Sequence, residues 1–244
     1  MLSTVKRLVV DTYQQQHLSD VARRVARARM TYLRPAKLRN LEACLRRIEA
    51  DAVPGDCLEF GVALGGSAII AATQMGAERS FVGYDLFGLI PPPSERDDDR
   101  AHARYAVIAS GRSEGIGGDR YYGYEPDLLA KVRYNFAAFG LEVDGRKIRL
   151  VPGFFADTLP LAGDGAVAFA HIDCDWYDPV LLCLEHSYRR LSRGRVHHPR
   201  RLQRLWRLPS RNGRVRGAAC RSATRRCHPQ CGIHEGLRPF PPRD

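Results

Sequence analysis

The sequence lacks the features that mark membrane and secreted proteins. No run of about 18 apolar residues occurs in the 244-residue chain, so we expect no transmembrane helix and no membrane partner. The N-terminal stretch is too short and too charged for a signal peptide. The seven cysteines form no paired framework, which indicates reduced thiols. These absences together predict a cytoplasmic protein.

Acidic side chains are nearly absent from the end of the chain. Residues 195–244 contain 13 arginines, no lysine and two acids, so they carry the whole net charge of +11. The first 194 residues are electrically neutral, which argues against an enzyme that acts on nucleic acid. With 44% apolar residues in the chain, this neutral body can bury the core of one main α/β domain.

The order of apolar segments predicts a Rossmann-like α/β fold. Residues 1–52 form an N-terminal helical segment by the spacing of their apolar side chains. A strand at 57–60, a glycine turn, a helix at 68–75 and a strand at 80–84 then give a nucleotide-binding half-sheet. The core is expected to span 53–194. Its remaining elements are helices at 127–139 and 179–191 and strands at 148–151 and 167–172.

Residues 88–125 interrupt this core with a long polar insertion. It contains Pro91-Pro92-Pro93 and a glycine-rich stretch near its end. An insertion of this length inside a compact domain is usually a lid or a binding loop. We therefore expect it to close over a bound small molecule.

A glycine turn that begins with an acid joins the first strand to its helix. The pattern is Glu59-x-Gly61-x-x-x-Gly65-x-Ser67. Its glycines allow close approach of a ligand, and the helix start offers free N–H donors. A dinucleotide fingerprint has glycine where Glu59 stands, and this acid would repel a pyrophosphate and suit an amine-bearing cation. Asp85 ends the next strand and is placed to bind ribose hydroxyls. These features favour S-adenosylmethionine over NAD.

Several of these residues have purely structural alternatives. Gly65 and Gly66 would then serve only to let the strand and helix pack tightly. Asp173 and Asp175 follow the strand at 167–172, where paired carboxylates suit a divalent cation or a general base. Either acid could instead cap the following helix. His171 is interpreted as a buried core histidine.

Four stretches of the chain resemble the macrocin O-methyltransferase family. They are residues 54–67, Tyr84-Asp85-Leu86-Phe87, residues 153–160 and His171-Ile172-Asp173-Cys174-Asp175-Trp176-Tyr177. Similar proteins methylate sugar hydroxyls of natural products with S-adenosylmethionine and Mg²⁺. The resemblance implies a metal-dependent O-methyltransferase for a sugar or other small-molecule hydroxyl, with a glycosylated metabolite as acceptor. A homo-oligomer is also expected.

The resemblance further implies roles for individual residues. Asp173 would be the catalytic base and a metal ligand, and Asp175 is the weaker metal candidate. Asp85 would bind the ribose of the cofactor. The residues at the cofactor's methionine end would be Glu59, Phe60, Gly61, Gly65, Gly66 and Ser67.

The tail departs from the family pattern after Gly194. Similar proteins continue with a strand and two acids that complete the metal site, whereas this chain has Arg200 and Arg201 there. If the codons of this tail are read one nucleotide out of register, they can encode an apolar strand followed by aspartate at positions 200 and 201. We hypothesise a frameshift near Arg193 to Arg195, which would leave residues 195–244 out of frame and disordered and the C-terminal strands missing.

Loss of these strands would have consequences for folding and function. The strand at 167–172 would become an open sheet edge, so the chain as written is expected to fold poorly and to be inactive. The alternative function is a non-catalytic relic or binding module whose basic tail engages acidic partners. An NAD-linked oxidoreductase is disfavoured because of Glu59.

Overall fold

The computed structural model describes residues 13–192 and the backbone of residues 217–219. Four parallel strands form most of one sheet: β1 (Asp56–Phe60), β2 (Phe81–Asp85), β3 (Ile148–Pro152) and β4 (Val167–Ile172). The strand order is β3-β2-β1-β4-β5, where β5 is Gly217–Ala219. The predicted Rossmann-like α/β fold is therefore confirmed.

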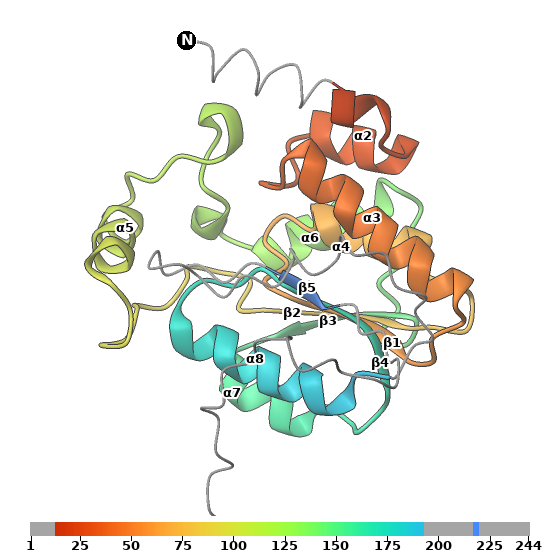
Figure 1. Ribbon diagram of the computed structural model, residues 1–244. Coiled ribbons are helices and arrows are strands. Elements are labelled where there is room, and N and C mark those ends of the chain that lie inside the picture. The colour runs from red at the N-terminus through yellow and green to blue at the C-terminus, as the bar shows by residue number, and fades with distance from the viewer. Residues whose placement is uncertain (1–12, 193–216, 220–244) are drawn as a thin grey trace, which may run out of the picture.

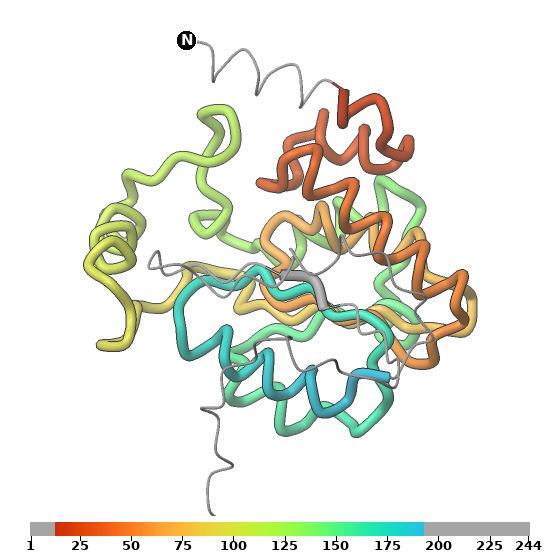
Figure 2. The backbone as a smooth tube through the Cα atoms, viewed as in Figure 1, coloured from red at the N-terminus to blue at the C-terminus, as the bar shows by residue number. Residues whose placement is uncertain are grey.

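Helices cover both faces of the sheet (Figure 1). Their bounds are α2 Asp20–Arg27, α3 Pro35–Ala50, α4 Gly66–Gln74, α5 Asp99–Ala109, α6 Leu128–Ala137, α7 Phe155–Thr158 and α8 Tyr177–Arg190. Helices α3, α4 and α6 lie on one face, and α7 and α8 lie on the other. Helix α5 stands away from both layers, as the backbone trace in Figure 2 shows.

The sheet separates two apolar clusters. Leu45, Ile69 and Phe136 belong to the cluster beneath the N-terminal helices, and Phe60 and Ile172 belong to the cluster beneath α8. All six residues of β4 are buried, as expected of a central strand covered on both faces. Burial of both faces explains why the continuous apolar run of this strand predicted its position so closely.

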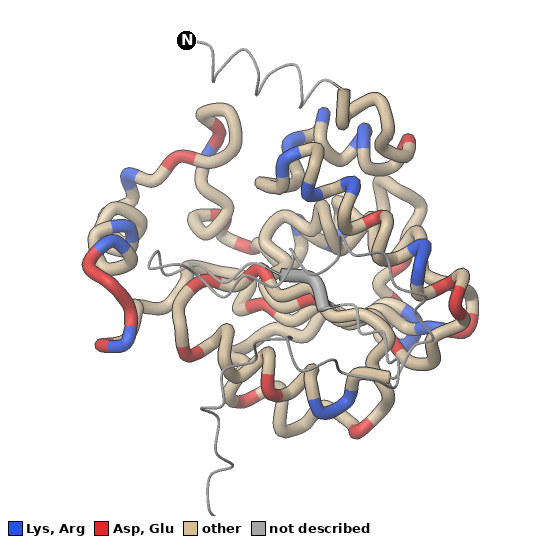
Figure 3. Tube along the Cα trace, viewed as in Figure 1, with Lys and Arg blue, Asp and Glu red and all other residues tan. Residues whose placement is uncertain are grey.

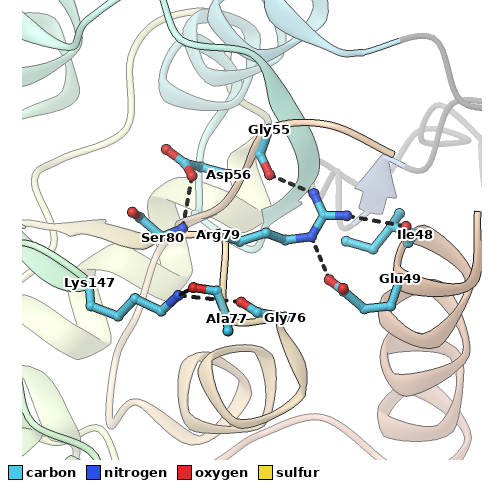
Figure 4. A network of polar contacts seen from close by, with 9 residues as sticks. All are labelled: Ile48, Glu49, Gly55, Asp56, Gly76, Ala77, Arg79, Ser80 and Lys147. Atoms are coloured by element: carbon cyan, nitrogen blue, oxygen red, sulfur yellow. Dashed lines mark hydrogen bonds and ion pairs between the residues drawn. The ribbon is translucent and has the colours of Figure 1, made fainter. Parts of the chain in front are cut away.

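Arg79 ties the end of α3 to the beginning of β1 (Figure 4). Its nearly buried guanidinium donates to the Glu49 carboxylate, to the Gly55 carbonyl at 2.7 Å and to the Ile48 carbonyl at 3.2 Å. These contacts lie at the amino ends of the strands. Since open α/β sheets bind ligands at the opposite edge, this network serves stability.

The insertion at 88–125 contains a helix, α5, that the sequence did not predict. Asp98 caps this helix by accepting a hydrogen bond from the Ala101 N–H at 2.9 Å. The segment before α5 docks on the loop after β4, because the Trp176 indole N–H donates to the Pro91 carbonyl at 2.8 Å. The insertion is therefore anchored beside the carboxyl end of β4.

Strand β5 corrects the expected open edge of β4. Its backbone pairs antiparallel with Ala170–Ile172, so the prediction of an open edge is wrong for these three residues. The C-terminal strands were expected to be missing, whereas three residues of the arginine-rich tail pair with this edge. Arg200 and Arg201 lie outside the described residues, as does the rest of 195–244 apart from β5.

The helices of the described residues include none with the length and apolar character needed to span a bilayer. Positions of charged residues of both signs are spread along the helices on both sides of the sheet (Figure 3).

Candidate active site

The carboxyl ends of the parallel strands border a cavity of about 370 Å³. Its walls come from the turn after β1, the ends of β2 and β4, and the insertion. Ligands of open α/β sheets bind at this edge. The predicted site residues that line it are Gly61, Ser67, Asp85, Asp173 and Asp175. The structure thus brings the glycine turn and the second carboxylate cluster together.

The glycine turn after β1 is packed directly against the end of β4. Gly61 has a φ of +90°, and a side-chain carbon there would lie 2.7 Å from the Asp173 carbonyl oxygen. Only glycine fits this conformation and this distance. The Asp173 N–H also donates to the Phe60 carbonyl at 2.9 Å, which fixes Asp173 beside the turn.

Glu59 is buried beneath the turn with one of its oxygens fully engaged. Oε1 accepts a hydrogen bond from the Ser67 hydroxyl at 2.5 Å and lies 3.0 Å from His171 Nδ1. Oε2 is buried and has no hydrogen-bond partner among the described residues. Leaving a carboxylate oxygen buried without a donor is costly, so this atom fits a ligand ammonium group. His171 is buried as predicted, and its bond to Glu59 was not foreseen.

Asp85 holds the glycine turn through three backbone hydrogen bonds. Oδ2 accepts from Val62 at 2.7 Å and from Ala63 at 2.9 Å, and Oδ1 accepts from Phe87 at 2.7 Å. Burial raises the pKa of this carboxyl above its ordinary value, and the three backbone bonds oppose the rise. A carboxylate has about four lone-pair sites, so Asp85 can still accept from a ribose hydroxyl in the cavity.

Four residues that the resemblance assigns to the cofactor do not line the cavity: Glu59, which lies buried beneath the turn, and Phe60, Gly65 and Gly66, which have structural contacts. Phe60 stacks on Tyr84 with ring centroids 5.3 Å apart. Gly65 is the N-cap of α4. The Gly66 N–H donates to the Met30 carbonyl at 3.1 Å, and a side-chain carbon at Gly66 would lie 2.4 Å from that oxygen. Gly66 therefore has the tight-packing role left open as the alternative.

Asp173 and Asp175 supply two carboxylates to the cavity. Within the described residues, no three His, Cys, Asp or Glu side chains gather as a metal site. The two further acids implied by the resemblance correspond to Arg200 and Arg201, which lie outside those residues. The two carboxylates supply only part of the ligand set that Mg²⁺ needs, so Mg²⁺ binding at this site remains a prediction.

The cavity has an aromatic wall that was not predicted residue by residue, and the insertion contributes Tyr121 and Tyr122 to it. Tyr32, Tyr121, Tyr122 and Trp176 line the cavity, and Arg104 of α5 lies among them. The Tyr121 and Tyr122 ring centroids are 4.5 Å apart, and those of Tyr32 and Tyr122 are 6.0 Å apart. Three tyrosines within residues 121–124 were the available signal in the sequence.

Comparison with known proteins identifies the family. A family model for the macrocin-O-methyltransferases (TylF) matches residues 3–114 and 125–196, which is most of the chain. The chain belongs to the macrocin-O-methyltransferase family. Its membership accounts for the order of the four sequence stretches and for the glycine turn that begins with an acid.

Named relatives of this macrocin-O-methyltransferase family member include two enzymes of actinomycetes. Mycinamicin III 3''-O-methyltransferase of Micromonospora griseorubida is 33% identical over 162 residues, which cover 65% of this chain and 59% of the relative. A Streptomyces olivaceus enzyme named 8-demethyl-8-(2,3-dimethoxy-alpha-L-rhamnosyl)-tetracenomycin-C 4'-O-methyltransferase is 33% identical over 168 residues, covering 65% and 57%.

The solved structure of the O-methyltransferase NovP has a related fold. It superposes with a TM-score of 0.52 at 27% sequence identity, covering 66% of this chain and 63% of NovP. The matched part of this family member thus spans less than two thirds of the length of each relative. The family match ends at residue 196, close to the point where the composition of the chain changes.

Proposed function

We propose that this family member binds S-adenosylmethionine and that, with its reading frame intact, it methylates a hydroxyl of a glycosylated small molecule. The observation that carries the proposal is the buried Glu59 carboxylate, whose Oε2 has no hydrogen-bond partner among the described residues. Asp85 lines the cavity that the adjacent glycine turn borders. The named relatives support the acceptor class, since both are O-methyltransferases and one has a rhamnosyl group in its name.

The residues at the turn would hold the cofactor at both of its polar ends. Glu59 Oε2 accepts a hydrogen bond from the ammonium group, and Asp85 accepts from the ribose. Ser67, which bonds Glu59 and also lines the cavity, keeps the acid in place. The bound cofactor supplies an electrophilic methyl group on its sulfonium.

Asp173 is the proposed general base. Asp173 lines the cavity at the end of β4, where its carboxylate would take the proton of the acceptor hydroxyl as the methyl transfers to oxygen. No step is assigned to Mg²⁺, because a third ligand is lacking among the described residues. Asp173, with Asp175 as the weaker candidate, remains its predicted ligand.

Calorimetry on the full chain tests the cofactor site. S-adenosylmethionine is expected to bind, and NAD is expected not to. Glu59→Gln should weaken S-adenosylmethionine binding at least about tenfold, because it removes a charge-assisted hydrogen bond. Glu142→Gln, which changes an exposed acid outside the cavity, is the matched control and should leave the affinity unchanged. Binding of NAD, or no binding of S-adenosylmethionine, would refute the proposal.

We also propose that the tail after Gly194 is out of frame, so that the chain as written is inactive. The reversed charge at Arg200 and Arg201 and the end of the family match at residue 196 support this. A version with the frame restored should methylate an acceptor, and Asp173→Asn in it should abolish turnover while cofactor affinity stays normal. An unambiguous in-frame read of the same tail in close relatives would refute the frameshift.

A further inference from the structure

The family model does not match residues 115–124, and this segment forms part of the cavity wall. It brings Tyr121 and Tyr122 to the cavity. The segment is fixed to the end of α5, because the Tyr124 hydroxyl donates to the Ile108 carbonyl at 2.5 Å and accepts from the Ser113 N–H at 3.1 Å. The wall of the cavity at this place is therefore a feature of this chain beyond the shared family pattern.

Arg104 is the sole lysine or arginine among the described residues that line the cavity. Its Nη2 donates to the Ser113 hydroxyl at 2.8 Å, and its guanidinium carbon lies 5.9 Å from the Tyr121 ring centroid. No ion pair joins it to a carboxylate in the part of the chain that the structure describes. A guanidinium has five N–H donors, so most of its hydrogen-bonding capacity is available to a ligand.

Acidic side chains and the basic Arg104 both line the cavity. Burial raises the pKa of Tyr121 to about 12, with Asp175 adding to the rise and Arg104 opposing it, so Tyr121 lies within the fields of both. Tyr122 has a raised pKa through burial, to which Asp175 and Asp85 contribute. Both phenols are therefore neutral at physiological pH, and Tyr121 lies close enough to sense both Asp175 and Arg104.

We infer that Arg104, with Tyr121 and Tyr122, forms a subsite for an oxyanion carried by the acceptor, either a phosphate or a carboxylate. This inference rests on the proposed function, which places the acceptor hydroxyl at Asp173. The planar guanidinium binds oxyanions with two parallel hydrogen bonds, and the tyrosine rings pack against the ring of the acceptor. Repulsion from Asp173 and the neighbouring acids disfavours the reversed orientation.

Three probes on one scaffold test the subsite in the full chain. They are nitrophenyl glucoside, its phosphate ester and nitrophenyl glucuronide, each titrated with and without S-adenosylhomocysteine. At least one anionic probe should bind about tenfold more tightly than the neutral glucoside. Whichever anionic probe binds more tightly indicates whether the acceptor carries a phosphate or a carboxylate.

Matched variants separate Arg104 from the general positive charge of the chain. Arg104→Gln should remove the preference for the anion while S-adenosylhomocysteine affinity stays unchanged. Arg112→Gln, which changes an exposed arginine outside this cavity, should keep the preference. Equal binding of all three probes to the wild type, or a preference that survives Arg104→Gln, overturns the inference. S-adenosylhomocysteine binding without an anion preference defeats this inference alone, whereas no S-adenosylhomocysteine binding defeats the proposed function.

Discussion

Replacement of His171 tests how the chain positions its cofactor acid. His171 pairs with Glu59 across the β1 and β4 ladder, and its Nδ1 lies 3.0 Å from Glu59 Oε1. Because a carboxylate only accepts, this ring nitrogen is the donor. His171→Leu would leave the Ser67 hydroxyl as the donor to that oxygen. The Glu59 side chain would then be less firmly held where the ligand ammonium binds.

The expected size of the effect follows from the hydrogen bond that is lost. A hydrogen bond to a charged group contributes about 1.5–3 kcal/mol, and Glu59 keeps its bond to Ser67. We therefore expect His171→Leu to reduce the binding free energy of the cofactor by an amount near the lower limit of this range, which corresponds to roughly tenfold weaker binding. His171→Asn retains an N–H donor close to the position of Nδ1 and should recover most of the affinity.

The assay compares S-adenosylhomocysteine with methylthioadenosine, which lacks the amino-acid portion and hence the ammonium group. His171→Leu should weaken S-adenosylhomocysteine binding and leave methylthioadenosine binding within about twofold of wild type. Thermal melts of each variant monitor the fold. Equal weakening of both ligands would mean that His171 supports the whole sheet, and the positioning role would be wrong. No change for either ligand would also contradict it.

Three further predictions concern stability, thiol reactivity and pH. Arg79→Met should lower the free energy of unfolding by about 3 kcal/mol in urea titrations, because a buried charge network is broken. Arg47→Met removes a half-exposed pair with Asp51 and should cost at most about 1 kcal/mol, so equal costs would contradict this reasoning. Burial raises the pKa of Cys57 to about 12, so iodoacetamide should label it only after unfolding, and rapid native labelling would be the contrary result. Burial also raises the pKa of Asp85, so S-adenosylhomocysteine affinity should fall as pH drops through that value, and Asp85→Asn should bind with little pH dependence. The stability of the ligand-free fold depends on pH in the opposite direction. The contribution of Asp85 to folding stability is complete below the pKa that this group has in the unfolded chain, and it is lost as pH rises through the higher pKa of the folded state.

The sheet could be predicted because its strands carry their own signal. β4 is apolar over nearly its whole length, and the strand predicted at 167–172 has the observed bounds. Helix α5 gave no comparable signal, since only Ala101 and Ile108 of its 11 residues are buried. With so few buried positions, an amphipathic period is too weak to distinguish a helix from a polar loop.

The site could be predicted in part for a similar reason. Gly61 and Asp85 belong to a local strand-turn-strand pattern, so their places follow from the sequence. Arg104 and Tyr121 reach the cavity only through the tertiary placement of the insertion beside the sheet edge, which has no local signature in the sequence. His171 was placed correctly in the core, but its bond to Glu59 depends on the register between β1 and β4.

The edge of β4 is where the altered tail and the site meet. Residues Ala170–Ile172 pair with β1 on one side and with β5 on the other. Asp173 follows them directly and is held to the Phe60 carbonyl, so the strand that pairs with β4 also borders the proposed base. A restored reading frame would change the residues at 217–219, so β5 as it stands would be absent and a different strand would cover this edge. The frame-restored chain should therefore differ from the given one in hydrogen exchange at Ala170–Ile172, and unchanged exchange there would contradict the idea that the frame determines what pairs with this edge.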